Sequence, residues 1–391
     1  MKSQNNFDLP LFALGFRTFF ALAGLSALIL IVIWNALFKG TLTAENYFSG
    51  PYWHAHEMLL GYSVAVIAGF LLTAIKDWTG KATISGRQLA GLSLLWLYGR
   101  VVPFYEGLLP DVVIALIDFA FLPVLAFQIS RFIIQSKQYK NFVFIGVLVL
   151  LMFGNGLIHA EILGFKQSTA WQGIQLCVAT IIVVMLIVAG QVFPLFTERG
   201  LMATIVIKNS LLDGLSVVSA LLVFGLQLFS SSGALLAIFA VFAALANAAR
   251  LSGWYVQKIW YVPLLWILYT GYAWIILGFV LTALSAFKLV TASTAIHAFT
   301  IGGVGVLTLG MMARVSLGLT GRALRASNSI SIAFVMINLA AFFGVILPMA
   351  MPNWYGASIY LSTMLWLLAF SLFVFVYTPM FTRQRLDGQA G

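Results

Sequence analysis

The chain has 391 residues, of which 62% are hydrophobic and only 8% charged, and its formal net charge is +10. Soluble domains carry about 25% charged residues, so this composition excludes an ordinary soluble enzyme or binding module. Many apolar runs approach the roughly 20 residues that a membrane-spanning helix needs. They do not alternate polar and apolar residues as the strands of a membrane β-barrel do.

Taken in chain order, the apolar runs predict an all-α fold, a polytopic transmembrane bundle of about 12 helices. We expect one integral membrane domain over residues 1–391, with no separate soluble domain. The first run, Thr18–Phe38, is too long for the core of a signal peptide and is interpreted as the first span. The helices are expected near residues 17–38, 54–75, 87–104, 108–132, 142–163, 172–196, 209–229, 234–252, 261–283, 293–315, 329–350 and 357–378.

Lysine and arginine predict the orientation of these spans. With twelve crossings, seventeen of the 21 basic residues fall on the side of the N-terminus. The positive-inside rule then places both termini in the cytoplasm. The net positive charge therefore reflects topology. No loop combines a basic run with interleaved aromatic residues, which excludes a nucleic-acid partner.

Only four histidines occur in the chain, and under this topology all of them lie near the outer side of the membrane. Two begin the second helix, one lies about 6 Å before the end of the fifth at a rise of 1.5 Å per residue, and one begins the tenth. Glutamates accompany the first three. These residues are His54, His56 and Glu57, then His159 and Glu161, and finally His297.

Small residues follow the histidines at helical spacing. On the second helix, His54, Glu57 and Gly61 are expected on one face, with His56 pointing away from it. Gly302, Gly303 and Gly305 follow His297. Small residues allow close approach of another helix or of a flat macrocycle, and both interpretations stay open. A packing role for each histidine is the simpler alternative.

Ionisable groups inside a membrane are costly, and they mark functional sites. Neutral imidazole suits haem iron and copper, and haem would be of type b because no Cys-x-x-Cys-His motif is present. We therefore predict a haem and metal site on the four histidines. Glu57 and Glu161 would donate protons or orient imidazoles. The single cysteine, Cys177, is expected to be a buried structural thiol.

Three further features bear on this site. Arg100 would pair with a haem propionate or extend to the membrane surface. Asp118, expected in the middle of the membrane, would relay protons or pair with a neighbour. His54 and His56 can bind one metal together only where the chain is not helical, which the preceding Gly50-Pro51 permits.

Six segments of the chain are distinctive: "FRTFF" (16–20), "WHAHEMLLGYSVAVIAGFLLTA" (53–74), "DWTG" (77–80), "GNGLIHAE" (154–161), "QVFPLFT" (191–197) and "HAFTIGGVGVLTLGMMARVSLGLTGR" (297–322). Together they resemble the NnrS family.

The resemblance implies a multi-pass protein of the bacterial inner membrane that contains haem and copper and is linked to nitric oxide metabolism and nitrosative stress. It also implies that His54, His56, His159 and His297 build the site. One departure is Leu319, which stands where the family commonly has a histidine in His-Thr-Gly-Arg. If that histidine is a ligand in other members of the family, this chain lacks the second site to which it would belong.

The predicted function is reduction of nitric oxide to N2O at a site near the periplasmic side of the membrane. The expected partners are an unidentified electron donor and the membrane lipid that surrounds the helices. A protein that binds nitric oxide or metal without turnover is one alternative. A secondary transporter is another, although the polar residues are expected at the outer edge and not at the midplane, where transporters bind substrate.

Overall fold

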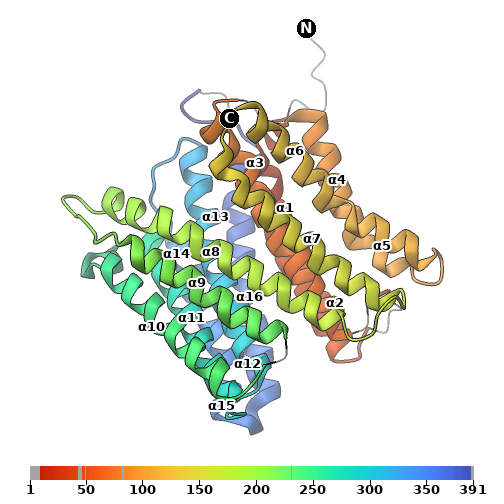
Figure 1. The fold of residues 1–391 in the computed structure, drawn as a ribbon. Helices are drawn as coiled ribbons and strands as arrows, with labels where there is room; N and C mark the ends of the chain where they lie inside the picture. The colour runs from red at the N-terminus through yellow and green to blue at the C-terminus, as the bar shows by residue number, and fades with distance from the viewer. Residues whose placement is uncertain (1–8, 43–45, 49, 82, 230, 389–391) are drawn as a thin grey trace. The chain divides into compact units, whose positions relative to one another are not determined.

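The computed structural model describes residues 9–42, 46–48, 50–81, 83–229 and 231–388. Within these residues the chain is built from helices without strands (Figure 1). It divides into two compact units, which are described separately. The first comprises Met1–Cys177, Ser316–Arg322 and Val374–Gly391, and the second comprises Val178–Val315 and Ala323–Phe373.

Six helices begin in the first unit. The second of them contains a π-helical segment between two α-helical parts, and the fourth is interrupted by a single residue. The bounds are α1 Gly15–Phe38, α2 Gly50–His56 continued by the π segment Glu57–Ser63 and by α3 Val64–Thr79, α4 Gly86–Val101, α5 Asp111–Phe119 with α6 Phe121–Gln135, α7 Phe142–Ile162, and α8 Ala170–Gly200, which continues into the second unit.

The remaining six helices begin in the second unit, and two of them contain π segments. Two of the six end in segments assigned to the first unit. The bounds are α9 Ser210–Leu228, α10 Ala234–Trp254, α11 Pro263–Ala286, α12 Ala292–His297 with the π segment Ala298–Gly305 and α13 Val306–Leu319, α14 Asn328–Ala341 with the π segment Phe342–Ile346 and α15 Leu347–Ala350, and α16 Tyr355–Phe381.

The described helices confirm the predicted all-α bundle of about twelve helices. Eleven of them are long and apolar enough to cross a membrane. The predicted helix 87–104 is the one that does not reach this length. Its α-helical part ends at Val101 and a short 3-10 turn, Val102–Tyr105, follows. Pro103 explains the change, because proline has no N–H to donate to the preceding turn.

Polar side chains fix the ends of several helices. In the first unit, the Phe16 N–H donates to Thr73 Oγ1 at 3.0 Å, which ties the start of α1 to α3. Arg17 is fully buried, and its Nη1 donates to the carbonyls of Phe381 and Arg383 at 3.0 and 2.6 Å. A cation at a helix C-terminus satisfies free carbonyls and interacts favourably with the helix dipole. The FRTFF motif therefore holds the end of α16.

Candidate metal centre

The second helix begins earlier than the sequence predicts. Helix α2 starts at Gly50, and the π segment begins directly after His56. Ser63 Oγ supports the wider turn by donating to the carbonyl of Met58, five residues earlier, at 2.8 Å. Single π turns inside α-helices occur frequently at functional sites. Beyond His56 the chain therefore departs from the 3.6-residue period that the prediction assumed, although Glu57 and Gly61 still lie side by side.

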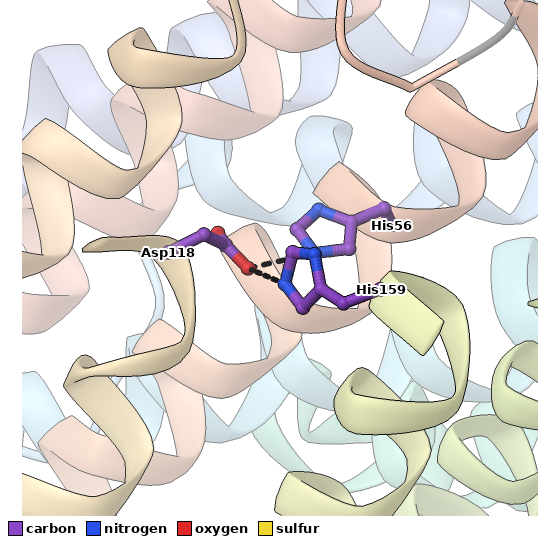
Figure 2. A group of neighbouring side chains, drawn as sticks. All are labelled: His56, Asp118 and His159. Atoms are coloured by element: carbon purple, nitrogen blue, oxygen red, sulfur yellow. Dashed lines mark hydrogen bonds and ion pairs between the residues drawn. The ribbon is translucent and has the colours of Figure 1, made fainter. Parts of the chain in front are cut away.

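Two histidines and one aspartate from three different helices meet in the first unit. His56 Nε2 lies 3.1 Å and His159 Nε2 lies 3.0 Å from the same oxygen, Oδ2 of Asp118. Figure 2 shows both imidazole rings turned toward this carboxylate. All three residues are buried, and one possible ligand atom from each lies within 4.8 Å of the others. This spacing suits three donors to a single metal ion.

A second layer of hydrogen bonds surrounds these donors. Asn155 Nδ2 donates to Asp118 Oδ2 at 3.0 Å, and Asn155 Oδ1 lies 3.1 Å from His56 Nε2. On the other side of His159, its Nδ1 lies 3.1 Å from the hydroxyl of Tyr47. Partners of this kind fix the ring orientation of metal-binding histidines.

Charged groups close the cluster into a ring. Arg100 Nη1 donates to Glu57 Oε1 at 2.8 Å, and Arg100 Nη2 donates to Asp118 Oδ1. Glu57 Oε1 also lies 3.0 Å from His56 Nδ1. Two carboxylates thus face one guanidinium, which leaves one negative charge to be balanced. Because an unbalanced buried charge is costly, a proton on imidazole or a bound cation has to supply the balance.

Aromatic and small residues shape the space around the ring. Phe48 stacks on His56 with a centroid distance of 4.0 Å and shields one face of the imidazole. Gly61 faces the charged groups, and a Cβ there would lie 3.2 Å from both Glu57 Oε2 and Arg100 Cδ. Gly61 therefore provides the room in which the carboxylate and the guanidinium meet.

Four of the predicted site residues thus come together, namely His56, Glu57, Arg100 and His159. His54 lies apart from them and stacks on Trp34 at a centroid distance of 4.5 Å. The backbone from Gly50 is helical, so the non-helical chain that would let both histidines of the HAH motif reach one metal is not present. Residues two apart on a helix point in nearly opposite directions.

Two other predicted residues also lie outside this cluster. Glu161 Oε2 accepts a hydrogen bond from the N–H of Ala170 at 2.6 Å, so this glutamate satisfies the start of α8. His297 belongs to the second unit and bonds within its own helix, to the carbonyl of Ser293. Glu161 was predicted to donate protons or to orient imidazoles, whereas the structure places it at the start of α8.

The structure shows how further residues join the site. Asp118, which was expected to relay protons or to pair with a neighbour, pairs with both His56 and His159. Asn155 lies one helical turn before His159, and this spacing indicates in the sequence itself that the two side chains share a helix face. Tyr47 and Phe48 precede α2, and neither has a motif that would have indicated its role.

The small-residue faces were expected to contact either a neighbouring helix or a flat macrocycle, and the structure distinguishes these two interpretations. In the first unit, a Cβ on Gly69 would lie 2.8 Å from the ring of Phe20, and in the second unit one on Gly302 would lie 2.5 Å from Trp274. Side chains of adjacent helices already fill both positions. These faces pack helices, and a macrocycle does not fit on them.

Apolar spanning helices around a buried cluster of two histidines and an aspartate define a multi-pass membrane protein with a candidate metal centre. The sequence matches the family profile described as NnrS protein over residues 10–385. The chain therefore belongs to the NnrS family, a metal-binding family linked to nitric oxide-related function. A search of curated proteins gave no match.

Proposed function

We propose that this chain is an inner-membrane oxidoreductase that reduces nitric oxide at a metal centre held by His56, Asp118 and His159. The supporting observation is the meeting of three buried donors from three helices within 4.8 Å. Two imidazoles and one carboxylate suit copper, zinc or non-haem iron. We propose copper or another non-haem metal here and haem b as a second cofactor, in line with the family resemblance.

The reaction consumes two NO, two electrons and two protons, and it yields one N2O and one water. A bound metal would supply a place where NO gains electrons in a fixed position. The electrons come from a donor protein or quinol that is not identified. Family membership and the buried cluster support this assignment, and the resulting role is protection against nitrosative stress.

The protein groups have distinct tasks in this proposal. Glu57 is fully buried, and its Oε2 accepts no hydrogen bond from the described residues, so this oxygen is available to carry a proton toward the reacting oxygen. Arg100 holds the carboxylates of Glu57 and Asp118 in place. Phe48 covers one face of His56 and keeps water from it. The imidazoles would bind the metal through unprotonated nitrogens.

We further propose that the centre lies on the periplasmic side and that both termini are cytoplasmic. The distribution of lysine and arginine supports this orientation. Small uncharged NO enters such a site through lipid, so the surrounding membrane is a path for the substrate and not a barrier.

A non-catalytic protein that binds NO or metal is the second candidate. The observation that favours it is the complete mutual bonding of the donors, since Asp118 Oδ2 alone has three partners. A secondary transporter would use the same ionisable groups without bound haem or metal, and metal analysis separates it from the first two candidates.

Purified protein should be analysed for metals and haem, and then supplied with reductant and NO without oxygen while N2O is measured by gas chromatography. The His159→Ala variant should lose the non-haem metal and N2O formation. Asp118→Asn, which alters the third proposed ligand, should have the same effect, and Asp111→Asn, which alters an exposed carboxylate on the same helix, is its matched control. Full metal and haem occupancy without N2O would contradict the enzyme and favour the binding protein.

A further inference from the structure

Arg314 is a buried cation near the end of α13. The residue is only 5% exposed, and it lies five positions before Leu319, the last residue of that helix. Its guanidinium carbon lies 4.0 Å from the centroid of the Phe196 ring, and Phe196 lies four positions before Gly200, the end of α8. At a rise of 1.5 Å per residue, both residues lie within about 8 Å of the ends of their helices. The pair is therefore close to the membrane surface and not at the midplane.

Three other arginines in the described part of the chain are buried, and each has oxygen acceptors. Arg17 donates to backbone carbonyls, and Arg100 donates to two carboxylates. Arg250 donates through Nε to Asp213 Oδ1 at 2.7 Å. Arg314, in contrast, forms no hydrogen bond or ion pair with any described residue. Since a guanidinium stays protonated in proteins, Arg314 is a buried cation without a counter-ion in the chain.

The second unit has no carboxylate left to neutralise Arg314. Glu198 and Asp213 are the only acidic residues of its sequence. Both are already engaged in ion pairs, with Lys208 at 2.9 Å and with Arg250 at 2.7 Å respectively. The aromatic ring beneath the guanidinium attracts the positive charge, but it does not accept the N–H groups as oxygen atoms do. An anion from outside the chain is therefore the partner that remains.

Such an anion can reach the guanidinium from the surface. Nε of Arg100 is fully enclosed and has no hydrogen-bond partner among the described residues, whereas no nitrogen of Arg314 is enclosed in this way. The N–H groups of Arg314 are thus open to a ligand. A planar guanidinium presents parallel donors that fit the oxygens of a phosphate in a bidentate manner.

The loop 201–209, which joins α8 to α9, indicates the source of the phosphate. It exposes three large apolar side chains, those of Met202 (95%), Ile205 (91%) and Ile207 (71%). Exposed apolar residues that lie together are typical of a surface that contacts a membrane or a partner. Basic pockets between transmembrane helices on the cytoplasmic side bind the headgroups of anionic lipids. The orientation proposed above places this end of α8 and α13 on that side.

We propose that Arg314 binds a phosphate group at a site between α8 and α13, and that this phosphate belongs to an anionic phospholipid. Two N–H groups of Arg314 donate to the phosphate oxygens, Phe196 packs against the guanidinium, and the acyl chains lie against the loop 201–209. The lipid supplies the negative charge that the second unit lacks at this position. The proposal does not depend on the proposed reaction or on the metal centre.

The test compares the wild type with Arg314→Met, Arg314→Gln and Arg325→Met as purified full-length proteins. Arg325 is exposed in the same unit, so its substitution is the matched control that removes one charge without altering a buried site. Each protein is freed of lipid in a non-ionic detergent and is then given phosphatidylglycerol, phosphatidylcholine or inorganic phosphate. Native mass spectrometry measures the bound lipid, and thermal unfolding measures stability.

We expect phosphatidylglycerol to raise the melting temperature of the wild type and of Arg325→Met, because a ligand that binds the folded state stabilises it. Arg314→Met should bind this lipid about 10- to 100-fold more weakly, owing to the loss of charge-assisted hydrogen bonds. Without lipid, Arg314→Met should be no less stable than the wild type, because it removes an unpaired buried charge. Arg314→Gln keeps a polar side chain, and it should bind the lipid as weakly as Arg314→Met.

Equal binding of phosphatidylglycerol by the wild type and either Arg314 variant overturns the proposal, as does a wild type that binds neither this lipid nor phosphate. A loss of stability in Arg314→Met that is the same with and without lipid also overturns it, since that result is expected from packing alone. Stabilisation by inorganic phosphate alone would support the phosphate site and refute the lipid as its source. Equally tight binding of phosphatidylcholine would refute the need for an anionic headgroup.

Discussion

His56 and Glu57 are neighbours in the chain, and their side chains are bonded to each other, with Nδ1 and Oε1 3.0 Å apart. Successive side chains of an α-helix normally point about 100° apart. The change from α to π geometry between these two residues accompanies their meeting. It lets one short stretch supply both an imidazole and a carboxylate to the same cluster.

Arg100→Met should destabilise the protein strongly. The substitution leaves Glu57 and Asp118 buried without their common cation, and breaking a buried ion pair costs about 3–5 kcal/mol. Unfolding in detergent, followed by tryptophan fluorescence, would measure the loss. Arg131→Met, at an exposed position of α6, should change the free energy of unfolding by less than about 0.5 kcal/mol. Equal stability of the two variants would contradict the role of Arg100.

Gly61→Ala tests the room around the charged groups. Replacing glycine by alanine within a helix normally stabilises it by about 0.5–1 kcal/mol. At position 61 the new methyl group would lie 3.2 Å from Glu57 Oε2 and from Arg100 Cδ, so we expect lower stability and weaker metal binding. Gly91→Ala, where the new methyl group would enter open space, is the control and should be neutral or stabilising. Identical metal content and stability in both variants would refute this view of Gly61.

Tyr47→Phe should weaken metal binding about tenfold, because it removes the hydroxyl bonded to Nδ1 of His159. Burial raises the pKa of the Tyr47 phenol above its ordinary value, as do the charges of Asp111 and Asp118. The raised pKa favours the protonated phenol in the folded protein, so its stabilising effect is complete below pH about 10 and is lost only above it. Competition with a chelator would measure the metal affinities of the wild type and of Tyr47→Phe. The ratio of these two affinities should be the same at pH 7 and at pH 9.

The exposed Tyr139 provides the control for this experiment, as Tyr139→Phe should bind metal like the wild type. A ratio that falls steeply between pH 7 and pH 9 would show that the phenol ionises within this range, contrary to the expectation.

Glu57→Gln should keep both cofactors and slow N2O formation by roughly 10²- to 10⁴-fold, as expected for the loss of a group that transfers a proton. The amide retains an acceptor for Arg100, and the three proposed metal ligands are unchanged. Steady-state rates, divided by the measured metal content, would give the effect. Glu106→Gln, at an exposed loop position, should have the wild-type rate. An unchanged rate in Glu57→Gln would remove this residue from the proton path.

Reporter fusions test the proposed orientation. A reporter inserted at Pro51–Trp53 should be active on the periplasmic side, and one at Ser136–Tyr139 should be active in the cytoplasm. The opposite pattern would invert the bundle and place the metal centre on the cytoplasmic side.

Much of the fold could be predicted because span length is a direct consequence of membrane thickness. Not every helix end could be predicted, since α4 ends at Val101 and a 3-10 turn that contains Pro103 follows. The π segments could not be predicted, since the residues Glu57–Ser63 are equally compatible with an α-helix.

The site could be predicted only in part, for a related reason. His56, Glu57, Arg100 and His159 were recognised as ionisable groups that a membrane protein has to pair. Asp118 was recognised as well, but its partners are 62 and 41 residues away and depend on the relative positions of the helices. Tyr47 and Phe48 are ordinary aromatic residues of a connecting segment, and only the folded chain reveals their contacts.

The bond between Arg17 and the last turn of α16 has a consequence for biosynthesis. The carbonyls that Arg17 binds are synthesised more than 360 residues after Arg17 itself. Until then, a guanidinium that is fully buried in the finished unit has no carbonyls of α16 to bind. The first unit therefore reaches its final form only after the end of α16 has been made, and removal of the residues from Met380 onward would weaken the unit that contains Arg17.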